Sequence, residues 1–300
     1  MKFTIRQEQL IQPLQMTGSI VERRHATPIL SNILFRVTPQ QLSITGTDLE
    51  VEMITHINLD NAQPGETTLP ARKMIDICRA LPAETDIEID VTGGRATIRS
   101  GKSRFTLSTL PSSEFPELNE LADNLLEFSL PQKELKQLID NTSFSMAQQD
   151  VRYFLNGICM EIGDGCLRTV ATDGHRLAMC SLPFEQTITE EYQVIIPRKA
   201  IVELSRLLVE PESPVAIQIG KNYLKFTFSS LVFSVKLIDG QFPDYQRVIP
   251  INNQNKLIAD RVELIQALKR ASILSNEKYR SIRLNFTENT LRVFAHNQEQ

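Results

Sequence analysis

Residue types capable of acid–base chemistry gather in residues 169–177, where a short apolar strand runs into Thr-Asp-Gly-His-Arg. Asp173 and His175 could form a catalytic pair. Such pairs are recognised by their geometry in the fold and not by closeness in sequence. Asp and Gly also favour a tight turn, because Asp bonds its own backbone and Gly accepts positive φ. The sequence therefore predicts a turn with a solvated polar tip, and the catalytic pair is the less favoured interpretation.

Asp48 and Asp173 are also the candidates for a metal-dependent nuclease, since each follows a threonine at the end of a predicted strand. A metal ion needs carboxylates within a few ångströms of each other. The two aspartates lie in different copies of an internal repeat, so the symmetry that relates them also separates them. We expect no catalytic residue, no metal site and no cofactor. Metal-dependent DNA cleavage that is lost on changing either aspartate would contradict this expectation.

The elements that position these residues recur along the chain with one offset. Matched motifs are separated by about 125 to 127 residues and keep the same order, which indicates a repeat of the size of a small domain. The matched motifs are Phe3-Thr-Ile5 with Phe128-Ser-Leu130, Thr47-Asp48 with Thr172-Asp173, Pro70-Ala-Arg-Lys73 with Pro197-Arg-Lys199, and Phe115-Pro116 with Phe242-Pro243. A third copy begins at Leu257, whose spacing to Leu264 repeats that of Phe3 to Leu10.

Each copy is predicted to contain a helix, a set of strands, a second helix and a second set of strands, in that order. Helical apolar spacing predicts helices over residues 6–16, 71–81, 132–141, 198–208 and 261–271. Strands are predicted within 27–59 and at 87–91, 95–110, 153–160, 166–171, 177–182, 215–219, 223–228, 231–238, 281–287 and 290–296, with linkers at 111–126 and 242–255. The strands outnumber what a βαβ sheet would hold, so we predict an α+β fold with antiparallel sheets. Module boundaries are expected at 1–122, 127–244 and 254–300.

Composition limits the class of protein. The 300 residues contain 41% hydrophobic residues, without a run of 18 apolar residues and without a signal-like N-terminus. We therefore expect neither a membrane span nor secretion. The four cysteines, Cys78, Cys159, Cys166 and Cys180, show no metal-binding spacing and are expected to be reduced and mostly buried in a cytoplasmic protein.

Charge is distributed unevenly although the net charge is only −4. The five predicted helices carry twelve basic and six acidic residues, so the rest of the chain is strongly acidic. If the helices share one surface, they form a basic strip. Such a strip is suited to binding the phosphate backbone of a nucleic acid without recognising its base sequence. The alternative is that these charged faces are simply solvated, and charge alone does not favour either reading.

Long strings of the sequence resemble one family. They include residues 1–4, 45–50, 70–73, 100–105, 107–111, 145–147, 149–153, 155–157, 169–177, 239–245 and 273–278. The chain resembles the bacterial sliding clamp, the beta subunit of DNA polymerase III, over its whole length. The resemblance implies a head-to-tail homodimer of three-module subunits, a ring with helices around a central hole and sheets outside. It implies a non-catalytic processivity factor of DNA replication, cytoplasmic and nucleoid-associated, that encircles duplex DNA and does not insert into membranes.

The resemblance also implies roles for single residues. It implies DNA contacts for Arg24, Arg72, Lys73, Arg79, Gln149, Tyr153, Arg198 and Lys199. It implies a groove for short linear motifs, used by the polymerase alpha subunit, the clamp-loader delta subunit and other polymerases or repair proteins, at Leu155, Thr172, Gly174, His175, Arg176, Leu177, Pro243, Arg247 and Val248. It implies a dimer interface at Lys73, Phe105, Leu107, Ile273, Leu274 and Glu299. Phe154 stands where the family often has a second tyrosine, so a hydroxyl contact is not expected there.

Length is the main departure from the family pattern. Three modules of about 125 residues predict about 370 residues, whereas this sequence has 300. We expect most of the third module and the far wall of the groove to be missing, and a chain of this length to close a ring poorly and to hold peptides weakly. A regulatory DNA-binding protein remains an alternative, but its recognition-helix motif is not seen. An assembly scaffold without a DNA role is another, and it would tolerate neutralisation of Arg24 and Gln149.

Overall fold

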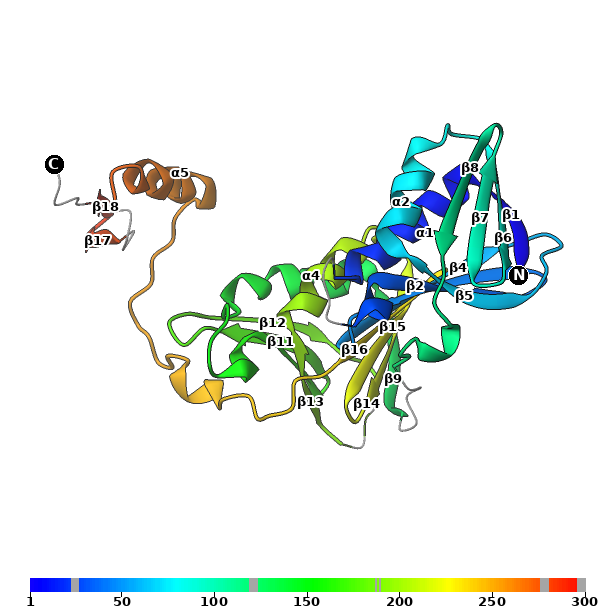
Figure 1. Cartoon of the computed structure of the whole chain (residues 1–300). Coiled ribbons are helices and arrows are strands. Elements are labelled where there is room, and N and C mark those ends of the chain that lie inside the picture. Colours follow the sequence, from blue (N-terminus) through cyan, green and yellow to red (C-terminus); the bar gives the residue numbers. More distant parts are fainter. Residues whose placement is uncertain (23–26, 119–123, 187, 189, 276–280, 296–300) are drawn as a thin grey trace. The chain divides into compact units, whose positions relative to one another are not determined.

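A computed structural model of the chain is shown in Figure 1. It describes residues 1–22, 27–118, 124–186, 188, 190–275 and 281–295. The chain divides into two units, a larger one at Met1–Phe242 and a smaller one at Pro243–Gln300. The two units are described separately below.

Helices form at all five predicted places. They are α1 (Gln7–Ile20), α2 (Ala71–Ala80), α3 (Gln132–Asp140), α4 (Arg198–Leu207) and α5 (Arg261–Ser272). The first helix runs four residues beyond its predicted end, because Leu10, Leu14, Thr17 and Ile20 keep one face buried to its last residue. Arg6 was expected in this helix, but it belongs to the strand that precedes it.

Sixteen strands are described in the larger unit. The first eight are β1 (Lys2–Arg6), β2 (Asn32–Val37), β3 (Gln41–Thr47), β4 (Val51–Asn58), β5 (Gly65–Pro70), β6 (Asp86–Thr92), β7 (Arg95–Ser100) and β8 (Ser103–Ser108). The next eight are β9 (Asn124–Pro131), β10 (Gly157–Gly163), β11 (Cys166–Thr172), β12 (Leu177–Pro183), β13 (Tyr192–Pro197), β14 (Pro214–Gly220), β15 (Tyr223–Thr227) and β16 (Leu231–Lys236).

The strand order repeats between the two sets of eight. In the first set, β5-β2-β3-β4 and β1-β6-β7-β8 are neighbours, and the second set repeats this as β13-β10-β11-β12 and β9-β14-β15-β16. All these pairings are antiparallel, as predicted. The two sets are joined by antiparallel pairing of β4 with β16, which makes one sheet of eight strands. Backbone hydrogen bonds therefore cross the junction between the two halves.

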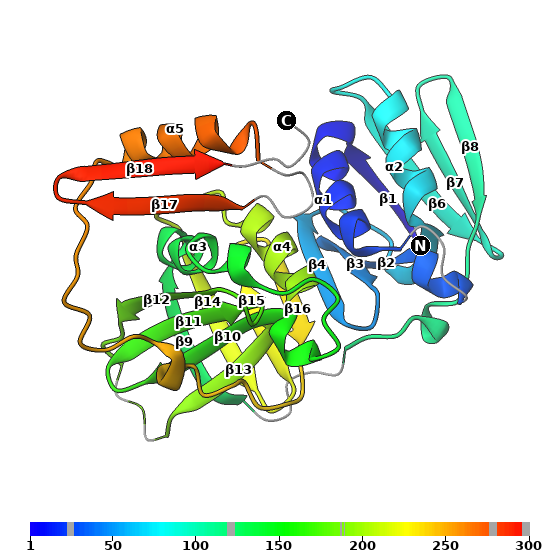
Figure 2. The same ribbon diagram turned by 90° about the vertical axis from the view of Figure 1, so that its left-hand side faces the viewer.

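Helix pairs cover the sheets within the larger unit. Figure 2 shows α1 beside α2 and α3 beside α4, and both pairs are in contact. There are two main apolar cores, with Leu10, Leu14 and Met74 in the first and Leu135, Ile201 and Leu204 in the second, which also includes Ile20, Val51 and Met53 of the first half. The alternating apolar strands thus supply one wall of each core and the helix stripes supply the other.

The smaller unit contains one helix and a hairpin. Asp260 caps α5 by accepting a hydrogen bond from the backbone nitrogen of Glu263 at 2.8 Å. Strands β17 (Ile282–Thr287) and β18 (Thr290–Ala295) pair antiparallel and contact α5. In the described parts of both units, no helix has the length and apolar character needed to cross a membrane.

Several sequence predictions were wrong. Residues 153–160 are not one strand, since Tyr153–Leu155 form a short 3₁₀ helix and β10 starts at Gly157. The predicted linker at 111–126 already contains the start of β9, and the second linker contains a 3₁₀ helix at Tyr245–Val248. Strands β1, β5, β9 and β13 were missed because each is short or lies directly before a helix whose pattern dominates the sequence.

Candidate nucleic-acid and peptide interface

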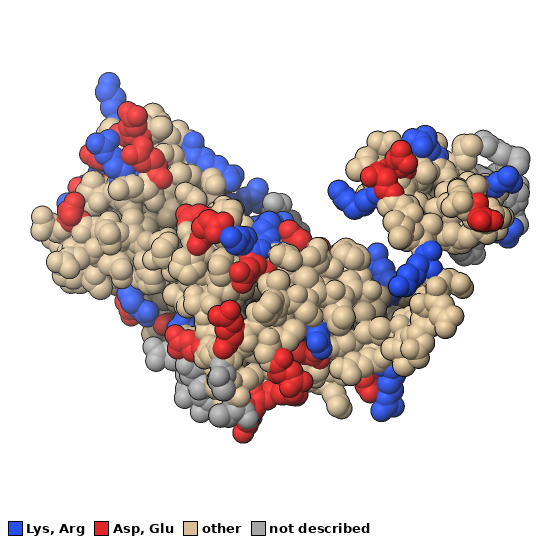
Figure 3. Space-filling view, turned by 180° about the vertical axis from the view of Figure 1, so that it is seen from behind, with Lys and Arg blue, Asp and Glu red and all other residues tan. Residues whose placement is uncertain are grey.

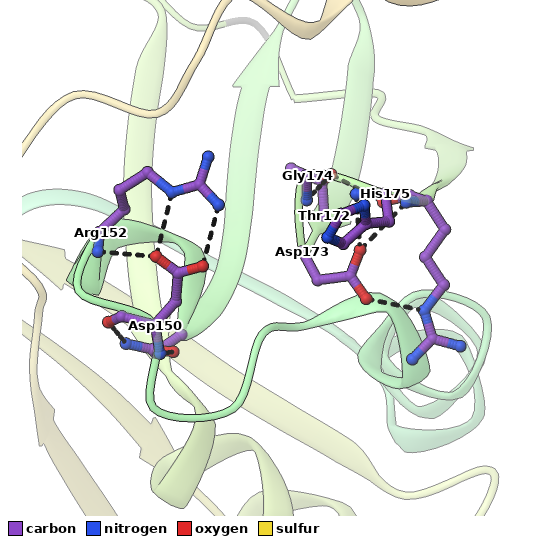
Figure 4. Close-up of polar contacts among 8 residues, drawn as sticks. Asp150, Arg152, Thr172, Asp173, Gly174 and His175 are labelled. Atoms are coloured by element: carbon purple, nitrogen blue, oxygen red, sulfur yellow. Dashed lines mark hydrogen bonds and ion pairs between the residues drawn. The ribbon is translucent and has the colours of Figure 1, made fainter. Parts of the chain in front are cut away.

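The turn between β11 and β12 is held by its own polar side chains (Figure 4). The Thr172 hydroxyl donates to the carbonyl of Arg176 at 2.7 Å and accepts from the nitrogen of Gly174 at 3.1 Å. One oxygen of Asp173 accepts from the backbone nitrogens of His175 and Arg176, each at 3.0 Å. Gly174 has φ of 86°, the left-handed conformation that glycine adopts without strain. The turn predicted from Thr-Asp-Gly is therefore confirmed.

Asp173 and His175 do not form a catalytic dyad in this arrangement. The described bond between them uses the backbone nitrogen of His175 and not its ring. The second carboxylate oxygen of Asp173 meets Arg176 Nε at 3.1 Å. Burial raises the pKa of Asp173, but the hydrogen bonds from His175 and Arg176 outweigh it, so the pKa lies below its ordinary value. Asp173 acts as the ionised acceptor that shapes the turn.

A second ion pair lies beside the turn. Asp150 and Arg152 are joined through Arg152 Nε and Nη2 at 3.0 and 2.9 Å (Figure 4). The hydrogen bonds from Arg152 lower the pKa of Asp150 to about 2. A side chain built on Gly174 would place its Cβ 3.1 Å from Arg152 Nη2, so the guanidinium covers the turn. Sequence reasoning assigned no role to Arg152, although the string 149–153 was among those that carried the resemblance.

An aromatic ring lies close to Arg176 of the turn. The guanidinium carbon of Arg176 lies 5.8 Å from the centre of the Phe144 ring, which is in range for a cation–π contact. Phe144 is 58% exposed, so its ring remains available to another molecule. The spacing gave no signal for Phe144, because an isolated exposed aromatic cannot be assigned from sequence alone.

The predicted groove residues fall into two groups. In the larger unit, Leu155 is buried, Thr172 and Leu177 are half-buried, and Gly174, His175 and Arg176 are exposed. The remaining three, Pro243, Arg247 and Val248, are exposed residues of the smaller unit, where Arg247 pairs with Asp244 at 2.7 Å. Five of the first six residues lie in or directly beside the turn between β11 and β12, and Leu155 ends the 3₁₀ helix before β10.

A twin of the turn connects β3 to β4 at Thr47–Val51. The Thr47 hydroxyl donates to the carbonyl of Val51 at 2.8 Å and accepts from Leu49 N at 3.1 Å. Asp48 accepts from the backbone nitrogens of Glu50 and Val51 at 2.9 and 2.8 Å. These four bonds repeat those of the Thr172–Arg176 turn, and Leu49 takes the positive φ, 77°, of Gly174. The internal repeat thus extends to individual hydrogen bonds.

The two turns differ in the partner of the outer carboxylate oxygen, Oδ2, which is the one that does not accept the backbone hydrogen bonds of the turn. Asp48 meets the ammonium group of Lys199, the second residue of α4, whereas Asp173 meets its neighbour Arg176. Neither aspartate is available to a metal ion in the way that a nuclease would require. No cluster of three or more metal-binding side chains occurs among the residues that the structure describes.

Basic residues of the helices are mostly exposed. Lys73 and Arg79 are exposed on α2, and Arg198 is half-buried at the start of α4. Within the described part of the chain, none of these three residues has an ion-pair partner. Arg72 lies 3.9 Å from Asp76 on the same helix. Figure 3 shows Lys and Arg side chains, with some Asp and Glu among them, along the upper edge of the larger unit, and Asp and Glu are frequent along its lower edge.

The loop residues predicted to touch DNA are only partly described. Gln149 is exposed with φ of 57°, and Tyr153 is 59% exposed. The Tyr153 ring meets that of Phe154 edge-on, with centroids 6.0 Å apart. Arg24 lies outside the described residues.

The predicted interface residues lie on an edge strand and at a helix end. Phe105 and Leu107 are half-buried on β8, the edge strand of its four-stranded sheet. Ile273 and Leu274, directly after α5, are 76% and 58% exposed. Glu299 lies outside the described residues, so its predicted contact with Lys73 stays a prediction.

Comparison with known proteins is consistent along the whole chain. Residues 1–119, 129–244 and 246–300 match the family models for the N-terminal, central and C-terminal domains of the DNA polymerase III beta subunit. The chain belongs to this family of beta sliding clamps. It is a DNA sliding clamp of replication, a non-catalytic subunit that confers processivity in the DNA polymerase III complex.

Named relatives support the assignment. The beta sliding clamp of Pseudomonas aeruginosa is 50% identical, and that of Escherichia coli K12 is 48% identical; each comparison covers all of this chain and 82% of the relative. A crystal structure of the Pseudomonas aeruginosa DNA polymerase III subunit beta matches with a TM-score of 0.97 at 50% identity, and Caulobacter crescentus pol III beta with 0.93 at 36%, again over all of this chain and 82% of the other. The predicted fold class and family are confirmed.

Proposed function

We propose that the chain forms a head-to-tail homodimeric ring around duplex DNA, contrary to the expectation from its length that it would close a ring poorly, and that the basic faces of its helices contact the DNA. The observation that carries this proposal is that Lys73, Arg79 and Arg198 have no ion-pair partner within the described residues. Such cations can follow phosphates through weak, salt-sensitive contacts without reading base sequence. We assign the same role to Arg24, Arg72, Gln149 and Tyr153.

Self-assembly through β8 is supported by the internal repeat. The equivalent of β8 in the second half is β16, and β16 pairs with β4 of another half. Strand β8 is an edge strand, so its unpaired backbone groups could pair with a strand of another subunit in the way that β16 pairs with β4. Phe105 and Leu107 on β8 and the exposed Ile273 and Leu274 supply apolar surface for a head-to-tail contact.

The Thr172–Arg176 turn is proposed as one wall of a groove for short linear motifs. Its rim presents His175 and Arg176, and its base includes the buried Leu155 and half-buried Leu177. Apolar depth with a polar rim is the usual form of peptide pockets. Pro243, Arg247 and Val248 are proposed to belong to the same groove. The partners are the polymerase alpha subunit, the clamp-loader delta subunit and other DNA-processing proteins, met in the cytoplasm at the nucleoid.

The decisive experiment separates topological from contact binding. The protein is loaded on nicked circular DNA with a clamp loader, free protein is removed at moderate salt, and half of the sample is linearised. Retention on circles with loss from linear DNA is expected for a ring. Equal retention on both forms would show contact binding, and immediate loss from both would show that no ring closes; either result contradicts the proposal.

The groove is tested separately with a fluorescent clamp-binding peptide. His175→Ala is expected to weaken peptide affinity, whereas Asp164→Ala in the β10–β11 turn serves as an exposed control without effect. An unchanged affinity in His175→Ala would remove this residue from the groove.

A further inference from the structure

Lys199 differs from the other basic helix residues because its ammonium group is already occupied. It meets the carboxylate of Asp48 and lies 3.6 Å from an oxygen of Glu22, both in the other half of the larger unit. The Asp48 side chain is only 3% exposed. Leaving that carboxylate without Lys199 would be costly, because a buried charge without a partner is strongly unfavourable.

The lysine contact lies where the two halves share backbone hydrogen bonds. The other oxygen of Asp48 accepts from the nitrogens of Glu50 and Val51, and Val51 is the first residue of β4. Val51 pairs with Val235 of β16, and the nitrogen of Lys236 donates to the carbonyl of Glu50 at 2.7 Å. The side chain of Lys199 thus fixes the turn from which the shared sheet begins.

A second contact follows one turn further along α4. Glu203 accepts a hydrogen bond from the Ser19 hydroxyl at 3.2 Å, and Ser19 lies near the end of α1. Glu203 is itself oriented by Arg206 at 2.7 Å. Positions 199 and 203 lie on the same face of a helix. One face of α4 therefore holds the first half at two points.

The twin turn explains why this position needs a lysine from another half. In the Thr172–Arg176 turn, the outer oxygen of Asp173 is paired by Arg176. The equivalent of Arg176 in the first turn is Val51, which carries no charge. The cation for Asp48 has to come from elsewhere, and Lys199 supplies it.

The electrostatic surroundings of Lys199 agree with this geometry. Burial lowers its pKa, but Asp48, Glu22 and Glu50 together raise the pKa above the ordinary value. The ammonium group is therefore stabilised where it is, and moving it to a DNA phosphate would require breaking the contact with Asp48.

We propose that Lys199 is a positioning residue that fixes the angle between the first two modules through Asp48, and that it is not a DNA contact. The proposal rests on the proposed function in one respect, since the angle between modules sets the curvature of a ring. It removes Lys199 from the DNA-binding set that the sequence predicts and leaves its neighbour Arg198 in that set.

The test compares two adjacent residues of the same helix. Lys199→Met and Arg198→Met each remove one positive charge and keep an unbranched apolar chain. Spin labels at positions 102 and 221, exposed turns of the two halves, report the distance distribution between them in a Cys166→Ser/Cys180→Ser background. Affinity for a short duplex is measured by fluorescence anisotropy over a range of salt concentrations, and thermal unfolding is followed in parallel.

Lys199→Met is expected to broaden the distance distribution and to lower the melting temperature by about 5 °C. The salt dependence of DNA binding stays unchanged. Arg198→Met should do the reverse, with a salt slope smaller by about one and an unchanged distance distribution. Lys199→Arg should restore the wild-type distance distribution, because it returns a cation to Asp48.

If Lys199→Met does not fold, Asp48→Asn tests the positioning role by the distance distribution alone, which it too should broaden; its amide oxygen still accepts the turn bonds while the charge that holds Lys199 is removed. A smaller salt slope in Lys199→Met with an unchanged distance distribution would overturn the proposal. This outcome is distinguishable from failure of the ring model, since that failure is seen with the wild-type protein on circular and linear DNA.

Discussion

The guanidinium of Arg152 covers Gly174, so that a Cβ at position 174 would lie 3.1 Å from Arg152 Nη2. Gly174 also has φ of 86°. Gly174→Ala is therefore expected to lower the free energy of unfolding by about 1–2 kcal/mol through backbone strain and to displace Arg152. Urea unfolding and peptide affinity measure the two effects.

Gly93→Ala is the matched control for this substitution. Gly93 also has positive φ, 59°, but a Cβ added there would have no atom within 4 Å. The control should lose a similar amount of stability and keep its peptide affinity. Equal affinities in the two variants would show that the position of Arg152 does not matter for peptide binding.

Lys73 provides a direct measure of phosphate contact. Lys73→Gln is expected to reduce the slope of log affinity against log salt by about 0.9, the effect of one phosphate contact on duplex DNA. Lys221→Gln, in the turn between β14 and β15, removes the same charge from an exposed site away from the helices. If both variants change the slope equally, the effect reflects net charge and not a contact by α2.

Glu52 makes the stability of the protein depend on pH. Burial raises its pKa to about 7, against the hydrogen bond that Leu118 N donates at 3.1 Å. Because the folded state holds this proton more tightly than the unfolded chain, wild-type stability falls as pH rises from about 4.5, the ordinary pKa, to 7. Glu52→Gln removes this dependence while keeping an oxygen for Leu118 N.

The stability of Glu52→Gln relative to wild type is expected to increase by about 2–4 kcal/mol between pH 4 and pH 8. Urea unfolding at the two pH values measures this difference. A constant difference between Glu52→Gln and wild type across this range would contradict the assignment.

Gly46 permits close packing of α1 on β3. A Cβ at Gly46 would lie 2.5 Å from the backbone oxygen of Thr17, which cannot move without shifting the helix. Gly46→Ala is expected to destabilise the protein by about 2–3 kcal/mol, the cost of overpacking. Chemical unfolding measures the change, and hydrogen exchange should show the loss of protection concentrated in α1. Retained protection there would locate the strain elsewhere.

Much of the fold is predictable from the sequence because its signals are local or repeated. The helix stripes at Leu10, Met74 and Leu204 lie where the cores need them. Thr172-Asp173 predicts a turn because its side chains bond to their own backbone. The strand predicted from residue 153 failed, since Tyr153–Leu155 form a 3₁₀ helix whose following residue, Asn156, bonds through its side chain to the backbone of Asp150.

The candidate site is less predictable because its contacts join distant segments. Arg152 reaches Gly174 across the fold, and Lys199 reaches Asp48 over 151 residues. From the sequence, Lys199 is a basic residue at the start of a predicted helix. Its neighbour Arg198 fits the same description, so the sequence does not distinguish the two. Only the fold shows that one of the two neighbours is already paired. The residue assignments for DNA, peptide and dimer contacts therefore remain proposals.

The pairing of β4 with β16 has a consequence for synthesis of the chain. Val51 leaves the ribosome 184 residues before its partner Val235. At bacterial rates of translation this interval lasts about 10–40 s, during which β4 is an uncovered edge on an otherwise formed sheet. Its apolar residues, including Val51 and Met53, are then exposed to other nascent chains. Until β16 is made, this edge has to stay unpaired for the two halves to join into one sheet.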